Sequence, residues 1–391
     1  MFFGDFFGLI QQNEEKRTQN RVDSRGKLCY NEDKQRGALA KNFLKEIFKM
    51  SQRKIRFSVV GVNGLGREHI EGIKKNSDIA ELVCICDNVP DIAKACAERN
   101  GVPYYTDFYE MLKVGGFDCV ILATPDYVHR EHAVAACEAG YNVICEKPIA
   151  QTIDDCAAMV DAAKRTGVKF MTGQVCRKAP GFVKAKELVD SGEIGELFFV
   201  ESEYAHDYSV TTKPWRWDPV NLRYSIIGGG CHAIDLLRWI AGDPEKVMAL
   251  ANRKVLSDWP VDDCTIAIMQ FPNNVVGKIF CGIGVKREYT MRTCLYGTKG
   301  TIICDNSSSD ITVYTHAVTD NNKHLYPAEK IPVEVNGHNV AAEIREMAMA
   351  ILNDTALECN AVEGSNTVAV GLAAVESAAK GGVPVVPKYF K

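Results

Sequence analysis

The fold of this chain is decided by the stretch Ile55-Arg56-Phe57-Ser58-Val59-Val60-Gly61-Val62-Asn63-Gly64-Leu65-Gly66. An apolar, β-rich run ends at Val60, a glycine turn follows, and residues 67–76 have the periodicity of a helix. The alternation continues to about residue 175, with apolar runs at 82–86, 119–123, 142–145 and 169–172, a short strand near Tyr104, and helical patterns at 90–100, 129–139 and 154–166. Continuous apolar strands that alternate with helices predict a parallel sheet covered on both faces.

The pattern changes beyond residue 180. Helical patterns at 182–191, 235–241, 340–352 and 367–380 accompany expected strands at 197–207, 246–255, 265–271, 275–282, 293–296, 301–304 and 311–314. We therefore predict an α/β protein with an N-terminal Rossmann-type parallel sheet and a C-terminal α+β domain built on a large, mostly antiparallel, open sheet. The expected division is an extension at 1–49, a nucleotide-binding domain at 50–175, and a domain for substrate binding and oligomerisation at 176–391. The apolar content of the uncovered sheet face favours self-association.

Residues 1–49 differ from the rest of the chain. Two apolar clusters, at 2–7 and 43–48, repeat at the spacing of a short amphipathic helix and flank a polar stretch. Two interpretations stand side by side. Either the segment is an arm that docks on a neighbouring subunit, or translation begins at Met50, just ahead of the first strand. An N-terminal peptide from before Met50, found by mass spectrometry of the native protein, would exclude the second interpretation.

Composition excludes several classes of protein. The 391 residues are 46% hydrophobic and 25% charged, which is too apolar for a disordered chain. The net charge of −4 provides no basic field for nucleic acid, and no apolar run approaches the ~20 residues that cross a bilayer. The 15 cysteines include no CxxC pair, so a zinc ribbon is not expected. Scattered free thiols and the absence of a basic, apolar leader predict a cytoplasmic protein. The charge and the lack of a long apolar run predict that neither nucleic acid nor a membrane is a partner.

The glycine turn has most of a dinucleotide fingerprint. In G-x-G-x-x-G, glycines allow close approach of the backbone to a pyrophosphate and of the helix to the strand. Here Gly61 and Gly66 match, Asn63 takes the second position, and Gly64 is additional. Asp87 ends the second strand about 20 residues later, where an acid binds the adenosine ribose hydroxyls. Because Asn88-Val89-Pro90 contains no cation for a 2′-phosphate, the sequence favours NAD over NADP.

Two more motifs end parallel strands, the edge at which open α/β sheets bind ligands. They are Ala123-Thr124-Pro125-Asp126-Tyr127-Val128-His129 and Glu146-Lys147-Pro148. With these, residues 55–391 resemble the Gfo/Idh/MocA oxidoreductases, which include glucose–fructose oxidoreductase and inositol dehydrogenase. Tyr296-Gly297-Thr298-Lys299-Gly300 and the terminal helix with Glu376-Ser377-Ala378 extend the resemblance into the second domain.

The resemblance implies roles for individual residues. It places NAD against Gly61, Asn63, Gly64, Leu65, Gly66, Asp87, Thr124, Pro125, His129, Glu146 and Lys147. It makes Lys147 and His232 the catalytic pair, which exchange the proton of the reacting hydroxyl or carbonyl. The family motif Asp-x-Gly-x-His-x-x-Asp is matched by Gly230, His232 and Asp235, but Gly228 stands where the family has its first Asp. Two roles are open for Asp235, which either orients the His232 ring or caps the helix.

Further residues are candidates for binding substrate. Aromatic faces beside hydrogen-bonding groups suit a polyhydroxylated ring, and the candidates besides Lys147, His232 and Asp235 are Arg177, Tyr204, His206, Trp215 and Arg216. The aromatic stretches among them fit a packed loop equally well. His129 and His132 lie one helical turn apart without acid or thiol at matching spacing, so no metal site is expected.

The predicted function is NAD-dependent hydride transfer to or from a secondary hydroxyl of a sugar, glycoside or cyclitol. The resemblance also suggests a redox-neutral glycosidase or lyase that oxidises a ring hydroxyl transiently, and the altered Gly228 keeps this alternative open. A third class, a non-catalytic NAD-dependent sensing module, would not need Lys147. A homodimer or homotetramer is the family expectation for the assembly.

Overall fold

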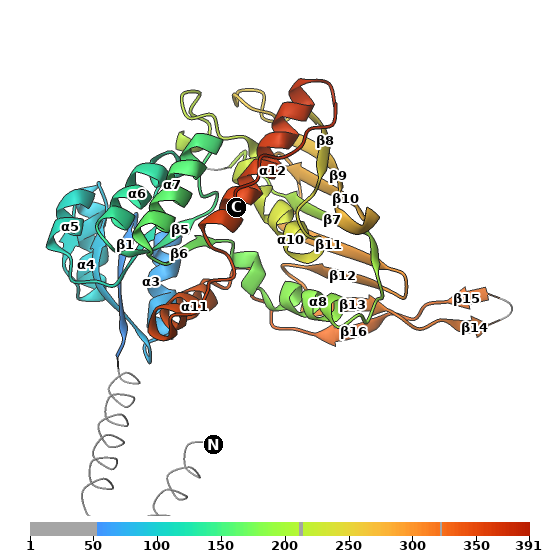
Figure 1. The fold of residues 1–391 in the computed structure, drawn as a ribbon, viewed down its shortest axis with the longest axis horizontal. Coiled ribbons are helices and arrows are strands. Elements are labelled where there is room, and N and C mark those ends of the chain that lie inside the picture. Colours follow the sequence, from blue (N-terminus) through green and yellow to red (C-terminus); the bar gives the residue numbers. More distant parts are fainter. Residues whose placement is uncertain (1–52, 211–213, 321–322) are drawn as a thin grey trace, which may run out of the picture. The chain divides into compact units, whose positions relative to one another are not determined.

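The computed structural model describes residues 53–210, 214–320 and 323–391, and Lys54–Lys391 form one compact unit. The predictions for residues 1–49 lie outside the described residues. Two large sheets organise this unit, as Figure 1 shows. The predicted fold class is confirmed.

The first sheet is parallel throughout and has the strand order β3-β2-β1-β4-β5-β6. Its strands are β1 (Ile55–Val60), β2 (Ala80–Cys86), β3 (Tyr104–Tyr105), β4 (Cys119–Leu122), β5 (Asn142–Glu146) and β6 (Phe170–Gly173). Its helices are α3 (Leu65–Lys75), α4 (Pro90–Asn100), α5 (Phe108–Val114), α6 (His129–Glu138) and α7 (Ile153–Thr166). The sequence pattern did not indicate α5, which begins at the side-chain cap of Asp107.

Both faces of this sheet are buried, as predicted from its apolar strands. Alternate residues of β4 enter two cores: Cys119 and Ile121 pack with α3 and α4, while Val120 and Leu122 pack with α5, α6 and α7. The first core also receives Ile344, Met347 and Ala348 from α11 (Val340–Asn353). A helix from near the end of the chain therefore completes one of the two cores of the first sheet.

The second sheet has the order β16-β13-β12-β11-β7-β10-β9-β8 and is antiparallel except for the β7–β10 pair. Its strands are β7 (Leu197–Ala205), β8 (Lys246–Asn252), β9 (Cys264–Gln270), β10 (Val276–Gly282), β11 (Thr290–Gly297), β12 (Thr301–Asp305), β13 (Asp310–Tyr314) and β16 (Glu329–Pro332). A separate hairpin joins β14 (Val318–Asp320) to β15 (Lys323–Leu325). The predictions missed β14, β15 and β16.

Helices cover one face of this sheet: α8 (Pro180–Asp190), the short α9 (Ser225–Gly228), α10 (Cys231–Ala241) and α12 (Ala361–Ala379). Both α10 and α12 begin earlier than predicted. For α12, Asn360 caps the backbone N–H groups of Val362 and Glu363. Gly364 lies inside this helix, although glycine is a poor helix former. A Cβ at this position would lie 2.2 Å from Thr172 Oγ1, so the glycine allows the helix to pack closely against β6.

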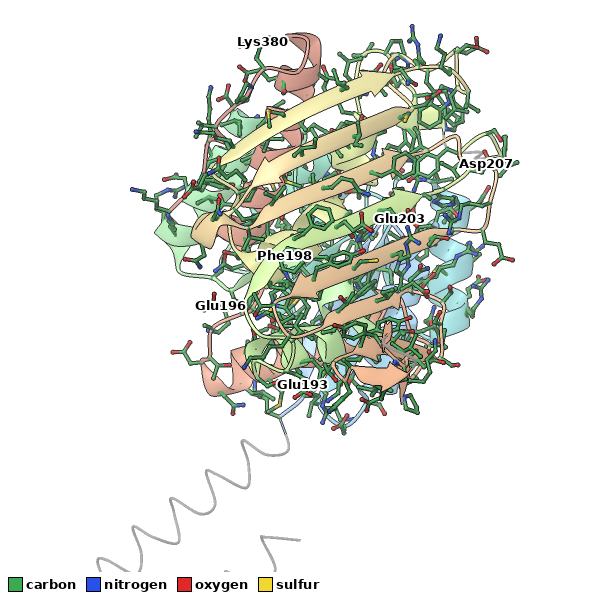
Figure 2. All side chains as sticks on the ribbon, turned by 90° about the vertical axis from the view of Figure 1, so that its right-hand side faces the viewer. Glu193, Glu196, Phe198, Glu203, Asp207 and Lys380 are labelled. Carbon is green, nitrogen blue, oxygen red and sulfur yellow. The ribbon has the colours of Figure 1, made fainter. Side chains whose placement is uncertain are left out.

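Figure 2 looks onto the opposite face of the second sheet, where Phe198 and Glu203 are labelled. Alternate side chains of the strands point outward here. They leave an exposed apolar surface, which we call the open face, made by Phe198, Met248, Leu250, Ile266, Ile268 and Val276. In the part of the chain that the structure describes, no helix is long and apolar enough to cross a membrane.

Candidate active site

The glycine turn between β1 and α3 requires its glycines. Gly61 has a φ of +82°, and a Cβ on it would lie 2.8 Å from the carbonyl oxygen of Ala123. A Cβ on Gly66 would lie 2.0 Å from the carbonyl oxygen of Gly61. Gly64 has a φ of +113° and precedes the first residue of α3. The turn therefore brings bare backbone and a helix N-terminus together, the arrangement that accommodates a diphosphate.

Asp87 lies beside this turn at the end of β2. One carboxylate oxygen accepts the backbone N–H of Val62 at 2.9 Å and the other accepts that of Val89 at 3.0 Å. Each oxygen keeps a second acceptor site for a ribose hydroxyl. Asp107 lines the same end of the cleft, so two acids there disfavour a 2′-phosphate.

A cleft of about 560 Å³ runs along the carboxyl ends of the parallel strands. Among the predicted cofactor and substrate residues, it is lined by Gly61, Asn63, Leu65, Asp87, Thr124, Pro125, His129, Glu146, Lys147, Trp215 and Arg216. Gly64 and Gly66 do not line the cleft themselves, but they allow the backbone conformation of the turn that does. Two buried atoms in its wall, Thr124 Oγ1 and His132 Nδ1, have no hydrogen-bond partner among the described residues. The glycine cradle, Asp87 and these unpaired atoms fit a dinucleotide.

His129 and Glu146 shape the middle of the cleft. The His129 ring lies between the carbonyl oxygens of Thr124 and Pro148, 3.0 Å from each. Glu146 accepts a hydrogen bond from His69 at 2.8 Å and another from the backbone N–H of Lys147 at 3.2 Å. Burial opposes ionisation of Glu146, but the hydrogen bond from His69 and the charge of Lys147 outweigh burial and hold its pKa below the usual value. An ionised Glu146 therefore positions Lys147.

The structure brings Lys147, which directly follows β5, close to His232, from α10. His232 is 1% exposed, and burial followed by the charge of Lys147 holds its pKa well below the usual range. The imidazole is therefore neutral near pH 7 and can accept a proton. Its Nδ1 lies 3.3 Å from the sulfur of Cys176, while its Nε2 makes no hydrogen bond within the described residues.

Aromatic rings surround this pair. The His232 ring stacks between Tyr204 and His338, with centroid distances of 6.0 and 5.8 Å. Tyr204 donates to or accepts from Tyr208 at 2.8 Å and lies 3.2 Å from His206 Nδ1. Tyr204 is buried behind the cleft lining, so it supports the site from beneath, whereas Trp215 and Arg216 face the cleft directly.

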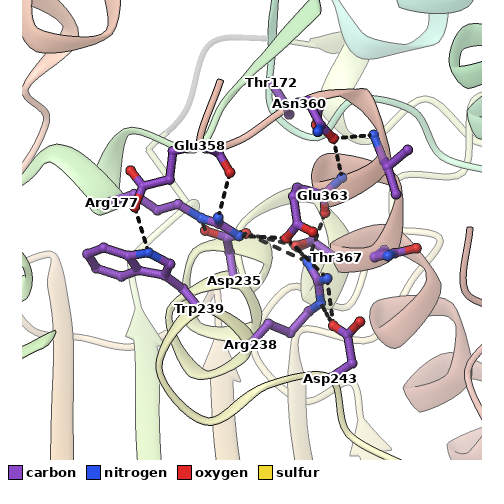
Figure 3. Close-up of polar contacts among 12 residues, drawn as sticks. Thr172, Arg177, Asp235, Arg238, Trp239, Asp243, Glu358, Asn360, Glu363 and Thr367 are labelled. Carbon is purple, nitrogen blue, oxygen red and sulfur yellow. Dashed lines mark hydrogen bonds and ion pairs between the residues drawn. The ribbon is translucent and has the colours of Figure 1, made fainter. Parts of the chain in front are cut away.

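His206 and His232 are not among the residues that line the cleft. Arg177 and Asp235 do not line it either. Their buried side chains form a two-pronged ion pair, at 2.7 and 2.8 Å, that also includes Thr367 (Figure 3). Asp235 neither orients the His232 ring nor caps a helix, because α10 begins at Cys231 and Asp235 lies inside it. The geometry therefore assigns the pair to joining the turn Val175–Lys178, which follows β6, with α10, and Thr367 extends the contact to α12. This differs from the expected roles in binding substrate.

Sequence reasoning missed the partner of Gly228. Arg223 forms a buried ion pair with Asp126 at 2.6 Å and donates to the carbonyl oxygen of Gly228 at 2.9 Å. Its guanidinium fills the space beside Gly228, where the family motif has a carboxylate. No local pattern points to Arg223, although Asp126 lies within the motif at 123–129. Cys176 and His69 were missed for the same reason, since neither belongs to a local pattern.

No group of three or more potential metal ligands occurs across the described ranges. His132 packs against the ring of Phe108 at 4.2 Å, and His129 contacts carbonyl groups. All cysteines that the structure describes are free thiols.

Comparisons with known proteins agree with this geometry. Residues 55–174 match the model of the oxidoreductase family with an NAD-binding Rossmann fold, and residues 182–303 match the GFO/IDH/MocA C-terminal domain. Inositol 2-dehydrogenase of Salmonella typhimurium is 26% identical over 62% of this chain and 69% of its own length. A 2,7-anhydro-N-acetylneuraminate hydratase of Mediterraneibacter gnavus is 28% identical over 64% of this chain and 67% of its own length.

Among solved structures, a levoglucosan dehydrogenase in complex with NADH superimposes with a TM-score of 0.80. The match covers 86% of this chain and all of that one, at 22% identity, and shows the shared fold. The cofactor predicted from the glycine turn and Asp87 is confirmed as NAD. The chain belongs to the GFO/IDH/MocA family of NAD-dependent oxidoreductases.

Proposed function

We propose that this enzyme oxidises a secondary hydroxyl of a sugar, glycoside or cyclitol, or reduces the corresponding ketone. NAD supplies the hydride acceptor, or in its reduced form the donor, when bound in the cleft. The observation that carries the proposal is the placement of Lys147 at the cleft wall beside the buried, neutral His232. The inositol dehydrogenase among the relatives supports this class of substrate.

The two side chains divide the handling of the proton. The Lys147 ammonium has no hydrogen bond or ion pair within the described residues, so its donors are available to the reacting oxygen. With the Nδ1–H of His232 directed at the Cys176 sulfur, Nε2 carries the lone pair that takes the hydroxyl proton. In the reductive direction the same atoms return a proton to the developing alkoxide.

Substitution of Lys147 tests the proposal. Lys147→Ala should lower turnover by about a hundredfold or more, the usual range for general acid–base groups. Fluorescence titration should still show NADH binding, because Asp87 and the glycine turn are intact. The matched control is Lys278→Ala, on β10 of the other sheet, which should keep its activity. Turnover of the Lys147 variant at a tenth of wild type or more would contradict the role.

A second candidate is a reaction without net oxidation, such as hydration or cleavage of a glycoside. Gly228 supports it, because the carboxylate of the family motif is absent, and one relative is named a hydratase. Incubation of the NAD-loaded enzyme with glycosides separates the two functions. Aglycone release without accumulation of NADH indicates the redox-neutral reaction, whereas stoichiometric NADH formation indicates the dehydrogenase.

We also propose that two copies associate through the open face, whose exposed apolar side chains gather on β8, β9 and β10. Ile268→Lys at its centre should shift the mass measured by light scattering toward the monomer, while Val114→Lys, at an exposed apolar residue of α5, should leave it unchanged.

A further inference from the structure

The cleft has an excess of positive charge at its Lys147 end. Three cations line this part of the wall: Lys147, Arg216 and Arg223. Of the two acids beside them, Asp126 is paired with Arg223 and Glu146 is bonded to His69. Lys147 and Arg216 have no carboxylate partner in the described ranges of the chain.

Arg216 lines the cleft and packs against aromatic rings. Its guanidinium lies over the rings of Tyr208 and Trp215, at 5.1 and 5.4 Å from the centroids. Its Nε is buried and finds no hydrogen-bond partner in the part of the chain that the structure describes. A guanidinium held between aromatic rings presents its planar fork in a fixed orientation, which suits two parallel hydrogen bonds to an anionic group.

Arg216 and Lys147 act at the same place. Both cations line the same cleft, and after burial, which is the main cause, their charges lower the pKa of His206 further. An anionic group bound by Arg216 would therefore belong to a molecule that also reaches Lys147. Arg223 adds a further change, since its guanidinium occupies the space where the family motif carries an acid. The site has thus lost one negative charge and retains two unpaired positive charges.

We infer that the substrate is a carbohydrate that carries an anionic group, either a carboxylate or a phosphate ester, and that Arg216 binds this group. The inference rests on the proposed dehydrogenase function and specifies its substrate class. In the oxidation, the carbinol carbon loses a hydride to NAD⁺, its hydroxyl loses a proton to the enzyme, and the product is a ketone. The anionic group takes no part in bond breaking.

Calorimetric titration of the NADH-loaded enzyme tests the inference with D-glucuronate, D-galacturonate and D-glucose 6-phosphate against D-glucose and D-galactose. At least one anionic sugar should bind about tenfold more tightly than its neutral counterpart, the magnitude expected for a charge-assisted hydrogen-bond pair. A preference for uronates identifies a carboxylate, and a preference for the 6-phosphate identifies a phosphate ester. If no anionic sugar binds better than its neutral partner, the inference is wrong.

Variants locate the effect. Arg216→Gln should remove the preference for anionic sugars, and Arg216→Lys should restore part of it, because a lysine keeps the charge without the fork. Arg99→Gln, at an exposed arginine of α4, is the matched control and should keep the preference. A tenfold loss of NADH affinity in Arg216→Gln, with the preference unchanged, would assign Arg216 to the cofactor and overturn the inference. Failure of the proposed function is separately visible as absent NADH binding or as full turnover in Lys147→Ala.

Discussion

The Cβ atom that Gly228 lacks would lie 2.0 Å from Nη1 of Arg223. This relationship explains how the chain departs from its family motif without leaving a void. The guanidinium takes the place of an acidic side chain and is held there by Asp126, which follows β4 of the first sheet. The exchange removes one negative charge from the site beside His232, and Asp126 balances the charge of the guanidinium.

Gly228→Ala tests this packing. The added methyl group must displace Arg223, so the free energy of unfolding should fall by about 1–3 kcal/mol, as in other overpacked cores. Denaturant titration measures the change. Gly181→Ala is the control, because its Cβ would meet the nearest atom at 3.5 Å, an ordinary contact. That variant should lose no stability, and an equal loss in both variants would contradict the account.

The buried histidine predicts a pH dependence of stability. Burial holds the pKa of His232 in the folded protein well below its ordinary value of ~6.5. Below pH ~6.5 the imidazole is therefore protonated in the unfolded chain but stays neutral in the folded one. Stability should therefore fall as the pH drops below about 6.5, by at most ~1.4 kcal/mol per pH unit for this group. Urea titrations at pH 7.5 and 5.5 should show a smaller difference for His232→Asn than for wild type. His316→Asn, at an exposed ring, should show the wild-type difference.

The ion pair between Arg177 and Asp235 predicts a large structural effect with little effect on cofactor binding. Asp235→Asn removes the buried carboxylate that pairs with Arg177 and leaves it with the partly exposed Glu363. Loss of one partner of a buried ion pair typically costs about 3–5 kcal/mol. Thermal unfolding should show the loss, while the NADH dissociation constant of the folded fraction should stay near that of wild type. Glu376→Gln breaks an exposed pair with Lys380 and should change stability little. A thermally unchanged Asp235→Asn would show that the pair is dispensable.

Asp87 predicts the choice of cofactor. Asp87→Ala removes the acceptor for the ribose hydroxyls, so NADH should bind about tenfold more weakly and the preference over NADPH should shrink. Fluorescence titrations with both nucleotides provide the measurement. Since the carboxylate also holds the glycine turn, Asp87→Asn is the milder companion variant. Asp91→Ala, at an exposed acid in the first turn of α4, should bind NADH like wild type; unchanged binding in Asp87→Ala would refute the assignment.

The parts of the site that could be predicted are those with a local pattern. Gly61, Gly66 and Asp87 follow from strand ends and turn chemistry, because a left-handed turn and a strand-end acid are features of short segments. Lys147 followed from its motif. The beginning of α10 was misplaced, since three consecutive glycines suggest a loop. In the structure these glycines allow close packing instead, and a Cβ on Gly229 would lie 2.4 Å from the Tyr204 ring.

The sequence by itself determined the alternation of strand, turn and helix, the dinucleotide cradle and the order of the two domains, because hydrophobic periodicity and glycine geometry act over a few residues. Only the tertiary structure decided which side chains meet. Cys176 reaches His232 across 56 positions, His69 reaches Glu146 across 77, and Arg223 reaches Asp126 across 97. Such pairs depend on how the sheets and helices pack, and their partners are selected by burial and charge once the chain has folded.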